Sequence, residues 1–141
     1  VVLGGGMLKG MDAMRVVAAA IVDEGRLLVV SKKAAPGVFY LPGGKPEPGE
    51  PAEETLAREL SEELGARPLD AELLGHVEDV AALEGVPMRM TVYTARLDRG
   101  PSPDAELAAL GWTDGRDEFE PRLAPAVRDQ VVPLLVRAGV L

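Results

Sequence analysis

The chain has 141 residues, no cysteine, one histidine, and 15 basic against 23 acidic side chains, which gives a formal charge of −8. A chain of this length is expected to form one domain that folds without disulfides or structural metal. The missing cysteines exclude disulfides, thiolate nucleophiles and sulfur-based zinc sites, and one histidine excludes multi-histidine metal sites within one chain. The acidic balance argues against binding to nucleic-acid polymers or anionic membranes.

The N-terminal 14 residues are expected to form a flexible segment, and residues 15–141 the single domain. The three consecutive glycines at 4–6 carry a high ordering entropy, and the segment has no periodic pattern. It lacks the basic start and cleavage site of a signal peptide. No run in the chain approaches the roughly 18 apolar residues that span a bilayer. The sequence therefore predicts a cytoplasmic protein, either a monomer or a homodimer.

The apolar pattern after residue 14 alternates between strand-like and helix-like segments. Strands are predicted at 15–22, 26–32, 38–41, 73–80, 88–97 and 107–113. Helices are predicted at 51–64 and 124–138, with Pro133 bending the second. The segment between 42 and 51 is dense in Gly and Pro, which predicts an irregular loop. Strands on either side of a central helix, followed by a final helix, predict an α/β domain with a mixed sheet and helices on both faces.

The helix at 51–64 has the clearest pattern in the chain. Pro51 suits the first position, and two glutamates follow in the first turn, where the helix dipole favours them. Leu56, Leu60 and Leu64 recur every four residues and predict a buried stripe. Gly65 is placed to end the helix.

Acidic side chains are concentrated on and just before this helix. Between residues 44 and 66 there are seven acids and two bases, a local charge of −5, whereas the rest of the chain carries −3. Glu59, Glu62 and Glu63 lie at i, i+3 and i+4 and so share one helical face, where like charges repel. A hard divalent cation such as Mg²⁺ or Mn²⁺ would offset that repulsion. The alternative is a solvated acidic face without a ligand.

A longer pattern surrounds these acids. Gly44 is followed after five residues by Glu50, and after seven more by the run RELSEELG at 58–65. This block resembles the signature of the Nudix hydrolase family, G-x5-E-x7-R-E-U-x-E-E-x-G-U, where U is a bulky aliphatic residue. Every polar and glycine position matches, and the last position departs because it is Ala66. The block is not an EF-hand, because no D-x-[DN]-x-[DN]-G loop precedes the acids.

The resemblance covers about 15–138 and implies a Nudix-type α/β/α sandwich. It also implies hydrolysis of a nucleoside diphosphate linked to another group, with Mg²⁺ as cofactor and Mn²⁺ as an alternative. Glu62 and Glu63 would be the principal metal ligands, and Glu59 a further ligand or the base. A backbone carbonyl of Gly43 or Gly44 would complete the shell. The box residues that carry these roles are Gly44, Glu50, Arg58, Glu59, Glu62, Glu63 and Gly65.

Two box residues are expected to support the others, and one acid lies outside the box. By the resemblance, Arg58 would orient the glutamates, and Glu50 would brace the loop or bind an outer metal. Mutator-type relatives carry another acid six residues before a tryptophan, which here is Glu106 before Trp112. Glu106 is therefore predicted as a further ligand or base. The competing candidates are Glu78, Asp79 and Glu84.

Substrate-binding residues are predicted less directly. Lys32 and Lys33 end the second predicted strand where that subgroup carries paired basic residues, and Lys33 is expected to touch a phosphate. The alternative for both lysines is a solvated strand end. Tyr40 and Trp112 are candidates to stack on a base, although core packing is the alternative. Leu123 stands where one subgroup has an asparagine that reads oxidised guanine, which argues against that substrate and favours pyrimidine nucleotides.

The sequence thus predicts a metal-dependent pyrophosphohydrolase of nucleoside triphosphates or other nucleoside diphosphate derivatives. The first alternative is an ADP-ribose or nucleotide-sugar pyrophosphatase. The second is a module that senses a nucleotide without cleaving it. Such modules typically lose a box acid, whereas this chain retains them all.

Overall fold

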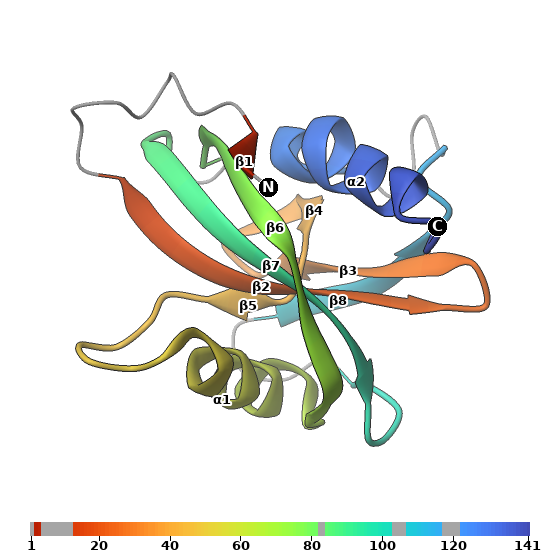
Figure 1. Ribbon diagram of the computed structural model, residues 1–141, viewed down its shortest axis with the longest axis horizontal. Helices are drawn as coiled ribbons and strands as arrows, with labels where there is room; N and C mark the ends of the chain where they lie inside the picture. Colours follow the sequence, from red (N-terminus) through yellow and green to blue (C-terminus); the bar gives the residue numbers. More distant parts are fainter. Residues whose placement is uncertain (1, 4–12, 82–83, 103–106, 117–121) are drawn as a thin grey trace.

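A computed structural model describes residues 2–3, 13–81, 84–102, 107–116 and 122–141. A twisted sheet forms the middle layer, with one helical layer on each face (Figure 1). The strands are β1 (Val2–Leu3), β2 (Met14–Asp23), β3 (Arg26–Lys32), β4 (Ala35–Tyr40), β5 (Gly43–Gly44), β6 (Pro68–Val80), β7 (Pro87–Leu97) and β8 (Leu107–Thr113). The helical segments are α1 (Ala52–Leu64), η2 (Val127–Val131) and α2 (Val132–Arg137). This arrangement confirms the predicted α/β/α sandwich.

The sheet is mixed, as predicted. Its main path runs β1-β6-β7-β2-β3-β4, with β5 paired to β2 and β8 paired to β3. The β1–β6 and β2–β7 pairs are parallel, and the remaining pairs are antiparallel. The long β2–β7 pair places Met14 opposite Met88 and Ala18 opposite Val92. Strands distant in sequence are thereby fixed side by side beneath the site.

β2 and β3 separate soon after the turn that joins them. The turn residues Glu24 and Gly25 have φ of 50° and 75°, which is typical of a two-residue hairpin turn. In this fully described hairpin, ladder pairing is confined to Val22–Leu27 and Asp23–Arg26. Beyond that point β2 pairs with β5, with Ala18 opposite Gly43. The separation lets the glycine-rich loop enter the sheet next to α1.

The core has two halves, one on each face of the sheet. Alternate residues of β2 point to opposite sides: Val17, Ala19 and Ile21 pack toward α1, whereas Ala18 and Ala20 pack toward α2. Because both faces are covered by helices, residues 17–21 of the apolar run in β2 are all buried. The sheet, packed on both faces, therefore supports the residues that project from the loops at its edges.

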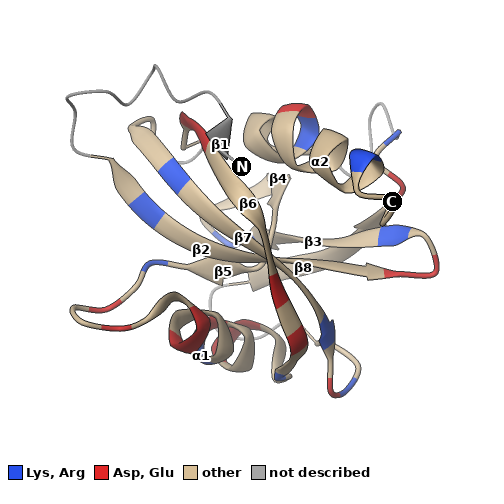
Figure 2. Cartoon of the chain, in the orientation of Figure 1, with Lys and Arg blue, Asp and Glu red and all other residues tan. Residues whose placement is uncertain are grey.

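Helix α1 has the predicted stripe and the predicted end. Leu56, Leu60 and Leu64 are fully buried against the sheet. Pro51 is the N-cap rather than the first helical residue, and Gly65 ends the helix in the left-handed region with φ of 65°. The acids of the helix differ in burial, since Glu53, Glu54 and Glu62 are exposed and Glu63 is buried. Figure 2 shows acidic residues gathered on α1 and the loop before it.

The final helical segment differs from a regular α-helix. Pro133 lies within it and has no N–H to donate to the preceding turn. The five residues before α2 form a wide π turn, in which the Val132 N–H donates to the Val127 carbonyl. The predicted helix at 124–138 is thus divided at the point where proline removes a donor.

The remaining differences from the predicted elements lie at strand ends. β6 begins five residues earlier than predicted, at Pro68, and β5 was not predicted. In the N-terminal segment, Val2–Leu3 pair in parallel with β6 and Met14 begins β2, while residues 1 and 4–12 lie outside the described residues. No helix in the described part of the chain is long and apolar enough to cross a bilayer.

Candidate active site

The loop between β5 and α1 is held by the carboxylate of Glu50. Its Oε1 accepts hydrogen bonds from the Glu47 N–H at 3.1 Å and from the Thr55 hydroxyl at 2.7 Å. The guanidinium of Arg58 and these two donors lower the pKa of Glu50 to about 2. Glu50 therefore stays charged and fastens the loop to the first turns of α1.

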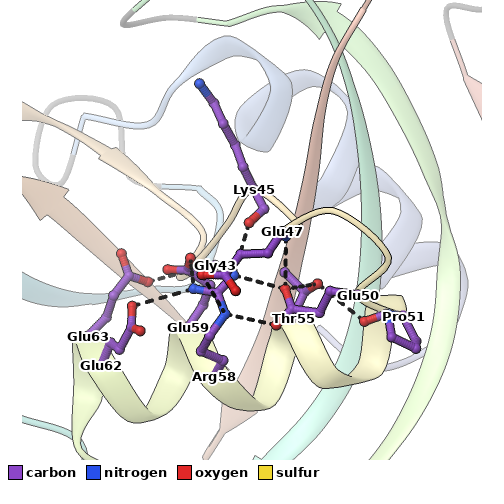
Figure 3. Close-up of polar contacts among 10 residues, drawn as sticks. All are labelled: Gly43, Lys45, Glu47, Glu50, Pro51, Thr55, Arg58, Glu59, Glu62 and Glu63. Atoms are coloured by element: carbon purple, nitrogen blue, oxygen red, sulfur yellow. Dashed lines mark hydrogen bonds and ion pairs between the residues drawn. The ribbon is translucent and has the colours of Figure 1, made fainter.

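Arg58 lies between two carboxylates and a backbone carbonyl (Figure 3). Its Nε and Nη2 donate to the two oxygens of Glu50, both at 2.9 Å, in a bidentate pair. Its Nη1 donates to Glu59 Oε1 at 2.9 Å, and its Nη2 also donates to the Lys45 carbonyl at 3.1 Å. The planar guanidinium thus fixes Glu59 relative to the loop, which a lysine could not do.

Glu59 is a mostly buried acid of the Arg58 network, with a side chain that is 16% exposed. Burial raises its pKa, and the hydrogen bond from Arg58 partly opposes that rise. Its carboxylate lies directly against Gly44, where a Cβ would fall 2.4 Å from the Glu59 Cδ. A side chain at this box position would therefore displace the Glu59 carboxylate, and glycine leaves room for it.

Glu63 is buried and points to the same loop (Figure 3). Its Oε1 accepts a hydrogen bond from the Gly43 N–H at 2.9 Å. Gly43 has φ of 150°, and a Cβ there would fall 2.1 Å from the Val17 carbonyl oxygen, so only glycine fits. β5 is thus joined to β2 on one side and to the acidic face of α1 on the other.

Glu62 differs from its neighbours in exposure. Its side chain is 56% exposed, and its Oε2 lies 3.6 Å from Arg58 Nη1. Within the described ranges, no three acidic or histidine side chains are gathered closely enough to hold a metal ion as they stand. The donor set nevertheless fits a hard divalent cation, because carboxylate oxygens of Glu59 and Glu63 share a cavity with the backbone of Gly43 and Gly44.

That cavity has a volume of about 360 Å³ and lies between the start of β7, the loop at 41–45 and the start of the last helical segment. Glu59 and Glu63 line it together with Lys32 and Lys45, and the charge of Lys32 acts on Glu59. The other side chains are mostly apolar. The full lining is Met14, Val16, Lys32, Tyr40, Leu41, Gly43, Gly44, Lys45, Glu59, Glu63, Val80, Ala81, Glu84, Met88, Met90, Ala124, Ala126 and Val127.

Two of the predicted substrate-binding residues differ in their position relative to this cavity. Tyr40 lines it, whereas Lys33 is exposed in the turn after β3 and its neighbour Lys32 lines the cavity instead. A register shift between β3 and β8 falls at Ser31 and Lys32, where the sequence gives no sign of it. Lys45 was missed, although its place directly after Gly44 could have indicated it.

The acids outside the box also differ in their placement. Glu106 lies outside the described residues. Of its competitors, Glu78 is buried in β6, Asp79 accepts a hydrogen bond from the Gln130 amide at 2.9 Å, and Glu84 lines the cavity.

The histidine and several of the described aromatic side chains have structural contacts. Trp112 packs at the edge of the α1-side core. The Nδ1 of His76 lies 3.1 Å from the Thr91 hydroxyl, and Phe39 packs against the α2-side core. Leu123 is buried in that core and does not line the cavity, whereas Val127 does. From this part of the chain, Ala124, Ala126 and Val127 line the cavity.

Comparisons with known proteins identify the family of the chain. The family model of the NUDIX domain matches residues 12–135. The chain is 34% identical over 122 residues to a Mycobacterium tuberculosis (strain H37Rv) protein provisionally named 8-oxo-dGTP diphosphatase 2, covering 84% of this chain and 86% of that protein. It is 31% identical over 120 residues to the CTP pyrophosphohydrolase of Escherichia coli K12, covering 82% of this chain and 87% of that protein.

A solved structure gives the same family. The crystal structure of the MutT NUDIX hydrolase from Burkholderia pseudomallei superposes with a TM-score of 0.70 at 34% identity, covering 82% of this chain and 93% of that chain. The match extends well beyond the box to the sheet and the last helical segment. The chain therefore belongs to the Nudix family and is a Nudix hydrolase.

Proposed function

We propose that this chain hydrolyses the pyrophosphate linkage of a nucleoside triphosphate, or of another nucleoside diphosphate derivative, with Mg²⁺ or Mn²⁺ as cofactor. The observation that carries the proposal is the cavity that joins Glu59 and Glu63 at one end to an apolar compartment at the other. An acidic end with two lysines suits a metal-bound polyphosphate, and an apolar end suits a nucleoside. The names of the two curated relatives, which refer to 8-oxo-dGTP and CTP, support a nucleotide substrate.

In this proposal the box acids have different roles. Glu62 and Glu63 are the principal metal ligands, and Glu59 is a further ligand or the base. A bound divalent cation would neutralise charge on the phosphate oxygens and lower the pKa of the attacking water. Glu59 suits the role of base because its raised pKa makes it a better proton acceptor than an ordinary carboxylate. Glu106 remains a candidate for either role.

The other polar residues position the reactants. Arg58 and Glu50 keep Glu59 in place, and the Gly43 N–H orients Glu63. Lys32 and Lys45 supply positive charge where the phosphates would lie. Water attacks one phosphorus, the bridging P–O bond breaks, and the departing phosphate takes the bond electrons. A triphosphate cleaved between its α and β phosphates would give a monophosphate and pyrophosphate.

A panel of phosphate-release assays tests the proposal. Nucleoside triphosphates, dinucleotides, ADP-ribose and nucleotide sugars are each incubated with enzyme and Mg²⁺, with inorganic pyrophosphatase added in one arm and phosphatase in the other. We expect triphosphates to release phosphate in the pyrophosphatase arm. Release only from ADP-ribose or nucleotide sugars, in the phosphatase arm, would favour the alternative substrate class.

A matched pair of variants separates the enzyme from contamination. Glu63→Gln is expected to lower turnover by at least about a hundredfold, because the amide removes a ligand charge without opening a cavity. Glu54→Gln changes an exposed acid on the same helix and should leave turnover within twofold. A flat response from the wild-type protein across the whole panel would overturn the proposal and favour a nucleotide-sensing module.

A further inference from the structure

The apolar compartment of the cavity contains little that can form hydrogen bonds. Met14, Met88 and Met90 form one side of it, and Ala126 and Val127 form another. Apart from the lysines and the groups around Glu59 and Glu63, the polar side chains that line the cavity in the described part of the chain are those of Tyr40 and Glu84. Among the side chains that the structure describes, these two are therefore the candidates to select a base by hydrogen bonding.

Glu84 lies at the end of the cavity remote from the phosphate-binding residues. It belongs to the turn between β6 and β7, where the Gly85 N–H donates to the Ala81 carbonyl at 2.8 Å. The strands on either side of that turn pair at Asp79 and Met88. Met88 also lies opposite Met14 on β2, so the turn is near the start of β2. Gly43, at the phosphate-binding end, is opposite Ala18 on β2. Ala18 is four residues from Met14, so the two ends of the cavity are about 13 Å apart along β2.

Charge decides which part of a nucleotide can face Glu84. A carboxylate repels phosphate, and its two oxygens only accept hydrogen bonds. Tyr40 is close enough that the charge of Glu84, added to burial, raises the pKa of its hydroxyl. The phenol therefore stays protonated at neutral pH and provides a donor beside the acceptor. This combination suits a ring edge that carries one donor and one acceptor.

We propose that Glu84 is a specificity-determining residue that selects nucleotides whose base carries an exocyclic amino group. The proposal rests on the nucleotide hydrolysis proposed above and names the class of base. Cytosine, adenine and guanine can donate an amino N–H to the carboxylate. Uracil and hypoxanthine present a carbonyl where cytosine and adenine carry the amino group, and two acceptors then face each other without a proton between them.

The test compares substrates that differ in that one group. The kcat/KM values are measured with Mg²⁺ for CTP against UTP and for ATP against ITP, in the wild type, Glu84→Gln and Glu72→Gln. Glu72 is exposed on β6 and does not line the cavity, so its variant is the control. We expect the wild type to prefer the amino base by about tenfold or more in at least the CTP–UTP pair. Glu84→Gln should reduce that preference to less than threefold, because the glutamine amide can also donate to a carbonyl.

Equal use of CTP and UTP by the wild type would overturn the proposal, as would a preference that survives Glu84→Gln. The kcat/KM ratio of CTP to dCTP is measured in the same variants. If Glu84→Gln changed that ratio alone, Glu84 would contact the ribose, and the proposal would be overturned. Binding of α,β-methylene CTP and α,β-methylene UTP, measured by calorimetry, separates this proposal from the proposed hydrolysis. Preferential binding without turnover supports the role of Glu84 and rejects the enzyme activity, whereas turnover without preference does the reverse.

Discussion

The backbone of Gly44 lies against the carboxylate of Glu59 so closely that a Cβ at residue 44 would stand 2.5 Å from one carboxylate oxygen and 2.6 Å from the other. The obstructing atoms belong to the end of a flexible side chain. Adding a methyl group would therefore move the acid rather than the backbone. The contact therefore affects the position of Glu59 more than the stability of the fold, and a single substitution can test this.

Gly44→Ala is expected to lower kcat by at least about tenfold, because it displaces Glu59 from its place beside Arg58. The melting temperature should change little. Gly37→Ala is the control, since its Cβ would meet no atom within 4 Å. Steady-state kinetics and thermal melts measure both effects. A large fall in the melting temperature of Gly44→Ala would contradict this prediction, because the loss of activity would then follow from a destabilised fold.

Arg58→Lys tests the bidentate geometry. Lysine keeps the charge but cannot bond both oxygens of Glu50 and Glu59 at the same time. We expect at least about a tenfold loss of kcat and a lower melting temperature. Arg99→Lys, in an exposed pair with Asp98, is the control and should be neutral. Wild-type kinetics in Arg58→Lys would contradict the positioning role.

Glu50 makes stability depend on pH. Its pKa is lowered from 4.5 in the unfolded chain to about 2 in the folded protein, so the folded state favours the charged form. The stability that it contributes is complete above about pH 4.5 and is lost as the pH falls toward about 2. Urea unfolding between pH 7 and pH 2.5 should therefore show a flatter curve for Glu50→Gln, with the variant less stable at neutral pH. Parallel curves would contradict this assignment.

The leucine stripe of α1 gives a prediction about stability alone. Leu60 is fully buried between the helix and the sheet, so Leu60→Ala should lower the free energy of unfolding by about 2–5 kcal/mol. Leu73→Ala, at a side chain that is 56% exposed, should change it by less than about 0.5 kcal/mol. Chemical denaturation measures both. Equal effects would mean that α1 is not packed as described.

Local pattern explains why α1 could be predicted from the sequence. The spacing of Leu56, Leu60 and Leu64 and the glycine after them depend only on the helix itself, and the structure has both. The box acids Glu59 and Glu63 likewise come to one cavity because helical spacing puts them on one face.

Long-range pairing explains what could not be predicted. β5 is a two-residue strand of glycines, visible only once β2 has separated from β3. The choice of Lys32 over Lys33 follows from a register shift against β8, and neither lysine differs in its local sequence context. The place of Glu84 depends on how far the β6–β7 turn extends beside Met14 and Met88.

A titration of Mn²⁺ followed by electron paramagnetic resonance tests the central claim most directly, because it detects the cation without requiring turnover. We predict that the wild-type protein and Glu54→Gln bind Mn²⁺ alike, and that Glu62→Gln and Glu63→Gln each bind it at least about tenfold more weakly. Unchanged Mn²⁺ affinity in both of the latter variants would contradict the assignment of these carboxylates as the metal site.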